Sequence, residues 1–145
     1  MSGGFFEELL GQSVVDKDKK NVPTSSFTGD GQVVGIYFSA HWCPPCRGFT
    51  PALAEFYKKM KSKGLEIVFV SSDRDEDSFN GYYETMPWLA VSFADRGRKQ
   101  QLCDKFGVTG IPTLVLLDGK TGEMITKDGR GVVQTDPNGD KFPWK

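Results

Sequence analysis

Two cysteines lie three positions apart in the segment WCPPC at 42–46, where an apolar run gives way to an amphipathic pattern. The run at 33–38 is rich in β-branched and aromatic residues and predicts a buried strand, and apolar residues at helical spacing over 49–60 predict a helix. A thiol at the start of a helix lies near unpartnered N–H groups and a partial positive charge, which lower its pKa. Residues at i and i+3 share one side of a helix, so the two sulfurs can close a disulfide. The pattern predicts thiol–disulfide exchange, with Cys43 attacking and Cys46 resolving the mixed disulfide.

The residues around the cysteines suit this chemistry. Pro44 stands near the first helical position, where a missing N–H costs little, and Pro44 and Pro45 together stiffen the loop. We expect Trp42 to shield the disulfide and contact the substrate, with pure packing as its alternative role. His41 either lowers the pKa of Cys43 when the imidazole is protonated, or shuttles a proton, or is an ordinary surface histidine. Arg47 either adds positive potential near the thiolate or is a solvated helix position.

Strands and helices alternate along the chain, which predicts a largely parallel sheet covered on both faces, with a final antiparallel hairpin. A polar turn at 16–21 is expected to join two further short strands near the N-terminus, and the tail from 136 onward is expected to be irregular. The predicted strands cover 33–38, 65–70, 90–93, 113–117 and 123–126. One predicted helix follows the cysteine motif, and two more cover 75–84 and 96–106.

Composition narrows the possible classes of protein. The length of 145 residues predicts a single domain, 1–145, and 18 basic against 19 acidic residues argue against a nucleic-acid or membrane-surface partner. No apolar run approaches the ~20 residues of a membrane span, and no secretory signal is recognisable. Three cysteines do not make a disulfide framework, so we expect the reducing cytoplasm, with nuclear entry left open. We also expect a monomer.

A second motif, Gly110-Ile111-Pro112-Thr113, stands before the predicted strand at 113–117. By itself Pro112 would be an ordinary proline at the start of a strand. Together with the WCPPC segment, it makes the chain resemble the thioredoxin superfamily. The resemblance implies that Pro112 is cis and faces the cysteines, and that the backbone of Ile111 pairs with an extended substrate.

Four further segments narrow the resemblance to the tryparedoxin and nucleoredoxin branch: YFSA at 37–40, CRGFTP at 46–51, MPWLAV at 86–91 and FPW at 142–144. His41, VSSDR at 70–74 and EELLG at 7–11 are more similar to nucleoredoxins. The resemblance implies an α/β thioredoxin-like fold, with a central mixed sheet flanked by helices on both faces and an N-terminal extension.

Two positions depart from the wider family. Ordinary thioredoxins bury an Asp beneath the cysteines where this chain has Tyr37, and tryparedoxins carry a Trp, which helps to recognise bis-glutathionyl-spermidine, where this chain has Ser72. Asp73 and Arg130 match positions near the reductant or substrate in tryparedoxins, and we interpret both as surface residues. Trp88 is expected either near the site or in the core.

Two other functions fit the cysteines less well. His41, Cys43, Cys46 and Cys103 are four residues of types that bind zinc, but structural zinc sites normally use two separated ligand pairs. Cys103, on the predicted helix 96–106, is interpreted as a small buried apolar residue, with a regulatory thiol as the alternative. We expect no metal at the site.

The resemblance implies a protein-disulfide reductase. No GxGxxG or Walker pattern is present, so electrons are expected from an external thiol reductant or reductase, and the Cys43–Cys46 disulfide is expected to act without a prosthetic cofactor. The expected partners are protein disulfides and that reductant. The alternative is a redox-gated binding module that regulates a signalling protein.

Overall fold

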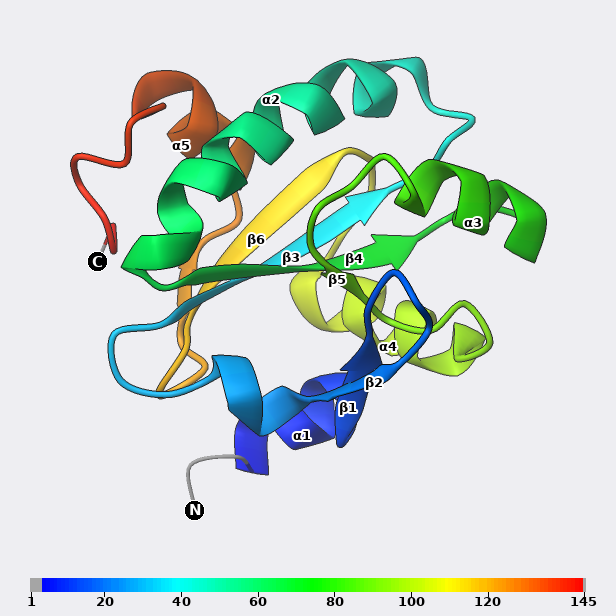
Figure 1. The fold of residues 1–145 in the computed structure, drawn as a ribbon, viewed down its shortest axis with the longest axis horizontal. Coiled ribbons are helices and arrows are strands. Elements are labelled where there is room, and N and C mark those ends of the chain that lie inside the picture. Colours follow the sequence, from blue (N-terminus) through cyan, green and yellow to red (C-terminus); the bar gives the residue numbers. More distant parts are fainter. Residues whose placement is uncertain (1–3, 145) are drawn as a thin grey trace.

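Seven strands form one sheet in the computed structural model, which describes residues 4–144 (Figure 1). Their order across the sheet is β2-β1-β5-β4-β3-β6-β7, and both edge strands have three residues. The strands are β1 (Ser13–Val15), β2 (Asn21–Pro23), β3 (Val33–Ser39), β4 (Leu65–Ser71), β5 (Leu89–Ala90), β6 (Thr113–Asp118) and β7 (Met124–Thr126).

The sheet is mixed, as the resemblance implied, but the expectation of a largely parallel sheet is wrong. Only β3–β4 and β4–β5 are parallel, whereas β3–β6, β6–β7, β1–β2 and β1–β5 are antiparallel. The difference arises because β6 runs antiparallel beside β3, and because β5 has only two residues and borders the N-terminal hairpin. Alternation of strands and helices does not determine these directions.

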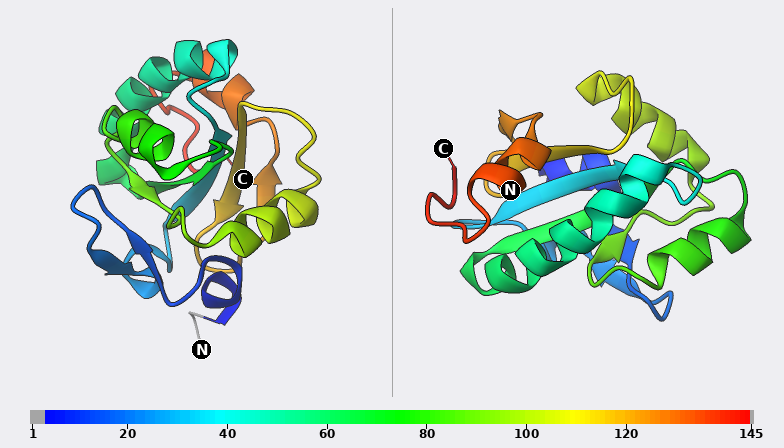
Figure 2. Two further views of the ribbon diagram at one scale, coloured as in Figure 1. Left: turned by 90° about the vertical axis from the view of Figure 1, so that its right-hand side faces the viewer. Right: turned by 90° about the horizontal axis from the view of Figure 1, so that it is seen from above.

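Helices cover both faces of the sheet (Figures 1 and 2). The helices are α1 (Gly4–Leu10), α2 (Pro44–Met60), α3 (Glu76–Tyr83), α4 (Arg96–Phe106) and α5 (Gly129–Thr135). We call the face covered by α2, α3 and α5 the upper face, and the face covered by α1 and α4 the lower face. Helices α1 and α5 were not predicted. Both have seven residues, too few to show a helical period.

The strands alternate their side chains between the two faces, which gives two cores. The upper core joins Tyr37 and Phe69 of the sheet to Leu53 of α2 and Phe79 of α3. The lower core joins the intervening strand residues to α1 and α4; its buried members are Phe6, Leu9, Leu10, Val14, Phe27, Val34, Ile36, Phe38, Val68, Val70, Val91, Leu102, Phe106, Val115 and Leu117.

Side-chain caps place the starts of the helices. Asp75, Asp95 and Asp128 each accept a hydrogen bond from the backbone N–H three residues later, at the starts of α3, α4 and α5. Cys43 caps α2 in the same way. Among residues 4–144, no helix is long and apolar enough to cross a membrane.

Candidate active site

Cys43 and Cys46 form a disulfide at the start of α2, just beyond the C-terminal end of β3, with their Cα atoms 5.2 Å apart. The Cys43 Sγ accepts a hydrogen bond from the Cys46 backbone N–H at 3.3 Å, and α2 begins at Pro44. Cys46 is fully buried, whereas Cys43 keeps 5% of its surface accessible. A sulfur in this position meets the partial positive charge of the helix N-terminus, as the sequence predicted.

The second motif faces the disulfide. The Ile111–Pro112 peptide bond is cis, in agreement with the resemblance, and the Ile111 carbonyl oxygen lies 3.7 Å from the Cys43 Sγ. Ile111 packs against the small cluster formed by Ala40 and the two cysteines. The loop before β6 therefore forms one wall of the site, at contact distance from the predicted nucleophile.

Trp42 is half-exposed, at 52% of its surface, beside the disulfide. Its indole N–H donates to the Ser72 carbonyl oxygen at 3.0 Å, which fixes the ring over the end of β4. Trp42 lines hollows on two sides. The larger, of about 600 Å³, also contacts Cys43, α4 and the loop 108–111, and we call it the α4 groove. The smaller, of about 210 Å³, includes Arg74 and is called the Arg74 hollow.

Asp73 braces the active-site turn and is not the surface residue we expected. Its side chain is 5% exposed, and Oδ1 accepts from the His41 backbone N–H at 2.8 Å while Oδ2 accepts from the Ser71 hydroxyl at 2.7 Å. Arg96, which the sequence did not single out, donates from Nη1 to the Ser71 carbonyl oxygen at 2.9 Å. These contacts join the end of β4 to the residues immediately before Trp42.

Arg130 braces the opposite wall and is also not a simple surface residue. It is partly buried, its Nη1 donates to the Pro112 carbonyl oxygen at 3.4 Å, and its guanidinium lies 5.5 Å from the centre of the Phe49 ring. No local signal in the sequence distinguishes Arg96 or Arg130 from ordinary surface cations, because their partners lie 25 and 18 positions away.

Buried hydroxyl groups lie beneath Cys46, where ordinary thioredoxins carry the Asp. The Tyr37 and Tyr82 hydroxyls each lie 2.7 Å from the Thr50 Oγ1, which also donates to the Cys46 carbonyl oxygen at 2.9 Å. Ser39 Oγ completes this hydroxyl cluster at 2.7 Å from the Tyr82 hydroxyl. Burial raises the pKa of Tyr37 above its usual value, so this residue stays protonated well into the alkaline range.

The remaining predicted site residues surround the disulfide with less contact. Pro44, Pro45 and Arg47 are exposed on the first turn of α2. His41 is exposed and its ring lies 5.7 Å from the Tyr82 ring. Trp88 belongs to the core, at 1% exposure and against the Tyr37 ring, so its alternative place near the site is wrong.

Cys103 is not the fully buried apolar residue we expected. It is a free thiol of intermediate exposure on α4, and it lines the α4 groove together with Cys43. Burial raises the pKa of its thiol, while the Lys99 ammonium partly opposes this rise. Within 4–144, no group of three or more His, Cys, Asp or Glu side chains is arranged to hold a metal ion.

A disulfide at a helix start, facing a cis-proline loop across the end of a mixed sheet, is the arrangement that defines the thioredoxin-like class of proteins. Comparison with known proteins agrees, since residues 31–124 match the Thioredoxin-like family. The chain is 52% identical over 141 residues to nucleoredoxin of Danio rerio and 50% identical over 115 residues to tryparedoxin of Trypanosoma brucei brucei. The chain belongs to the thioredoxin-like family, among the nucleoredoxins and tryparedoxins.

The two groups of relatives differ in length. The match covers 96% of this chain but 33% of the Danio rerio nucleoredoxin, so the chain spans about a third of that relative. It covers 79% of this chain and 80% of the tryparedoxin. The solved tryparedoxin from Trypanosoma brucei superposes with a TM-score of 0.88 at 44% identity, over 97% of both chains. A tryparedoxin II complexed with glutathionylspermidine superposes at 0.86 with 40% identity, over 92% of both.

Proposed function

We propose that this chain reduces disulfides in protein substrates. The observation that carries the proposal is the Cys43–Cys46 disulfide, with the Cys43 sulfur at the accessible side and 3.7 Å from the Ile111 carbonyl oxygen. The attacking sulfur must reach the substrate, and the resolving sulfur must be held beside it. Cys43 meets the first requirement and the buried Cys46 meets the second.

The reaction proceeds through two exchanges that transfer two electrons. In the reduced protein, the Cys43 thiolate attacks one substrate sulfur; a bond forms between them, and the other substrate sulfur leaves as a thiolate. Cys46, deprotonated, then attacks the Cys43 sulfur and releases the second substrate thiolate. The protein is left oxidised as the Cys43–Cys46 disulfide. An external dithiol, or two monothiols, must supply the electrons that regenerate it, and no prosthetic group takes part.

Three properties of the whole protein belong to the same proposal. We place it in the cytoplasm, because its odd cysteine count does not suit a secreted disulfide framework, and we propose that it is a monomer. Its reductant is a small thiol or a reductase. Ser72 lines the α4 groove where tryparedoxins carry a tryptophan, which argues against a reductant that depends on stacking there.

A redox titration in thiol–disulfide buffers tests the proposal. We expect one two-electron transition between roughly −180 and −270 mV, seen both in tryptophan fluorescence and in alkylation of Cys43. Cys43→Ser should abolish reduction of a protein disulfide, whereas Cys46→Ser should accumulate the mixed disulfide. Thiols that stay blocked until a chelator is added would overturn the proposal in favour of a metal site.

The half-exposed Trp42 supports a second candidate, a redox-gated binding module for a signalling protein. One comparison separates the two. A reductase loses its function with Cys43→Ser, whereas a binding module keeps its affinity for the partner in that variant and loses only the dependence on redox state.

A further inference from the structure

The loop at 107–113 separates two hollows next to the disulfide. On one side lies the α4 groove of about 600 Å³, which contacts Cys43 and Trp42. On the other side lies a hollow of about 400 Å³ that includes Lys127 and Arg130, which we call the Lys127 hollow. Residues 108–111 line both hollows, so this part of the loop is the wall that they share.

The charged side chains that line these two hollows are all cationic. Lys99 is the charged residue of the α4 groove, and Lys127 and Arg130 are those of the Lys127 hollow. Arg130 is engaged with the Pro112 carbonyl and the Phe49 ring. Within residues 4–144, neither the Lys99 nor the Lys127 ammonium has a hydrogen-bond or ion-pair partner.

Helix α4 turns its basic side towards the site. Arg96, Lys99 and Cys103 lie at i, i+3 and i+7, which is one face of a helix. Arg96 bonds to the end of β4, and Lys99 and Cys103 line the groove. The Lys99 charge acts on the Cys103 thiol, so the ammonium lies close to the groove wall.

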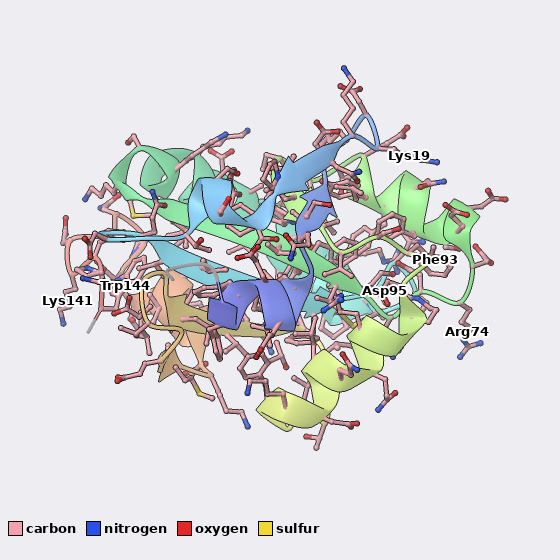
Figure 3. All side chains as sticks on the ribbon, turned by 90° about the horizontal axis from the view of Figure 1, so that it is seen from below. Lys19, Arg74, Phe93, Asp95, Lys141 and Trp144 are labelled. Carbon is pink, nitrogen blue, oxygen red and sulfur yellow. A yellow bond between two sulfur atoms is a disulfide. The ribbon has the colours of Figure 1, made fainter. Side chains whose placement is uncertain are left out.

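The carboxylates of the Arg74 hollow already accept hydrogen bonds. In the Arg74 hollow, Asp73 accepts from the His41 N–H and the Ser71 hydroxyl, and Asp75 accepts from the Ser78 N–H at 2.8 Å as the cap of α3. Arg74 in the same hollow extends into solvent at one end of the molecule, 5.9 Å from the centre of the Trp42 ring (Figure 3). A chain of net charge −1 therefore presents unpaired cations on both sides of Trp42.

We propose that the preferred substrates are disulfides in extended, acidic polypeptide segments, whose carboxylates pair with Lys99 on one side of the 108–111 loop and with Lys127 on the other. This inference rests on the proposed function and names its substrate class. Two cations on opposite sides of a loop fit a strand with acidic residues before and after the reacting cysteine. Such complementarity acts mainly on the rate of encounter and weakens with salt.

The test compares three peptides that share one cysteine disulfide loop and differ only in their flanks, which are glutamate, glutamine or lysine. At low salt, about 20 mM, we expect kcat/KM for the glutamate peptide to exceed that for the lysine peptide by about tenfold or more. At about 300 mM salt the ratio should fall towards one. The ratio cancels any change in the reactivity of Cys43 itself.

Charge-reversal variants show which lysines cause the preference for the glutamate peptide. Lys99→Glu and Lys127→Glu should each lower the glutamate-to-lysine ratio by about three- to tenfold, and the double variant should favour the lysine peptide. Lys20→Glu is the matched control, because it changes net charge equally on an exposed turn beside Lys19, at the tip of the β1–β2 loop (Figure 3). It should leave the ratio within about twofold of the wild type. A ratio near one in the wild type, or equal effects of all three substitutions, overturns the inference.

A binding measurement separates this inference from the proposed function. Peptides with serine in place of cysteine are titrated against the oxidised protein by calorimetry. If no peptide is reduced but the glutamate peptide still binds more tightly through Lys99 and Lys127, the reductase proposal fails and the acidic preference stands. If all three are reduced equally and bind equally, the reductase stands and the acidic preference fails.

Discussion

On the upper face of the sheet, the buried side chains include Tyr37, Tyr82 and Trp88, and four hydroxyl groups are bonded to one another beneath α2. On the lower face, the buried members of the hydrophobic core under α1 and α4 are all hydrocarbon side chains, and the buried Thr24 hydroxyl beside them donates to the Gly11 backbone carbonyl oxygen at 2.6 Å. Both cores are equally inaccessible to solvent, and both pack against the same strands.

The difference follows from what each face supports. Packing between hydrocarbon side chains is non-directional, so it stabilises the sheet without fixing the position of any particular atom. Hydrogen bonds are directional, and the Thr50 hydroxyl connects the tyrosines to the Cys46 carbonyl in the first turn of α2. The upper core therefore both stabilises the sheet and orients the helix turn that carries the disulfide.

Removing packing from either face gives the largest expected effect. Leu53→Ala in the upper core and Ile36→Ala in the lower core delete fully buried side chains. Each should lower the free energy of unfolding by about 2–5 kcal/mol in urea titrations, because a cavity remains. Met124→Ala, at a half-exposed position, is the control and should cost about 0.5 kcal/mol or less. A loss below about 1 kcal/mol at Leu53 or Ile36 would show that its face can collapse.

Adding a hydroxyl to the lower core, or removing one from the upper core, gives a smaller effect. Phe38→Tyr buries a hydroxyl in the lower core, where the buried side chains offer no acceptor, and should cost about 1–3 kcal/mol. Tyr37→Phe removes a hydroxyl from the cluster and should cost about 0.5–1.5 kcal/mol. Urea titration measures both. A neutral Phe38→Tyr would contradict the contrast between the cores.

Alkaline pH should destabilise the fold through the buried tyrosines of the upper face. Burial raises the pKa of Tyr37, Tyr57 and Tyr83, so the folded chain holds these protons to higher pH than the unfolded chain. The stabilisation is complete below about pH 10 and is lost as pH rises from there through the folded pKa values. Tyr37→Phe should make the slope shallower by about 0.7 kcal/mol per pH unit on average between pH 9 and 11, since the unfolded tyrosine titrates near pH 10. An unchanged slope in urea titrations from pH 9 to 11 would contradict this assignment.

The smallest effect concerns Cys103, which packs at the edge of the lower core. Because burial raises the pKa of its thiol, alkylation at pH 8 should be several-fold slower than that of an exposed peptide cysteine. Lys99→Gln should slow it further, since the Lys99 ammonium favours the thiolate. Mass spectrometry of the reduced protein measures both rates. Reaction as fast as the peptide would show that the edge of the lower core opens readily.

The sequence predicted the elements better than their arrangement. Helices α3 and α4 were predicted to within one residue at each end, although their caps, Asp75 and Asp95, were not identified as caps. The buried strands β3 and β4 are long enough to show their pattern. Helix α5, with two glycines in seven residues, has little helical propensity of its own. The antiparallel direction of β6 depends on tertiary packing that no local pattern encodes.

The reacting residues of the site were predictable, but the hydrogen bonds that hold the site in place were not. Cys43, Cys46 and Pro112 stand in two short motifs, and the structure brings these motifs together. Asp73 and Arg130 could be matched to positions in relatives, yet their hydrogen bonds to His41 and Pro112 cross 32 and 18 positions. Interactions that depend on the register of distant segments leave no trace in local composition.

The two edge strands of the sheet affect how copies of this fold meet at high concentration. Strands β2 and β7 have three residues each, and β2 ends in Pro23, which has no N–H to donate. Short borders offer few free backbone groups on which a neighbouring polypeptide can add a strand. Two copies of this fold therefore offer each other little edge along which their sheets could join.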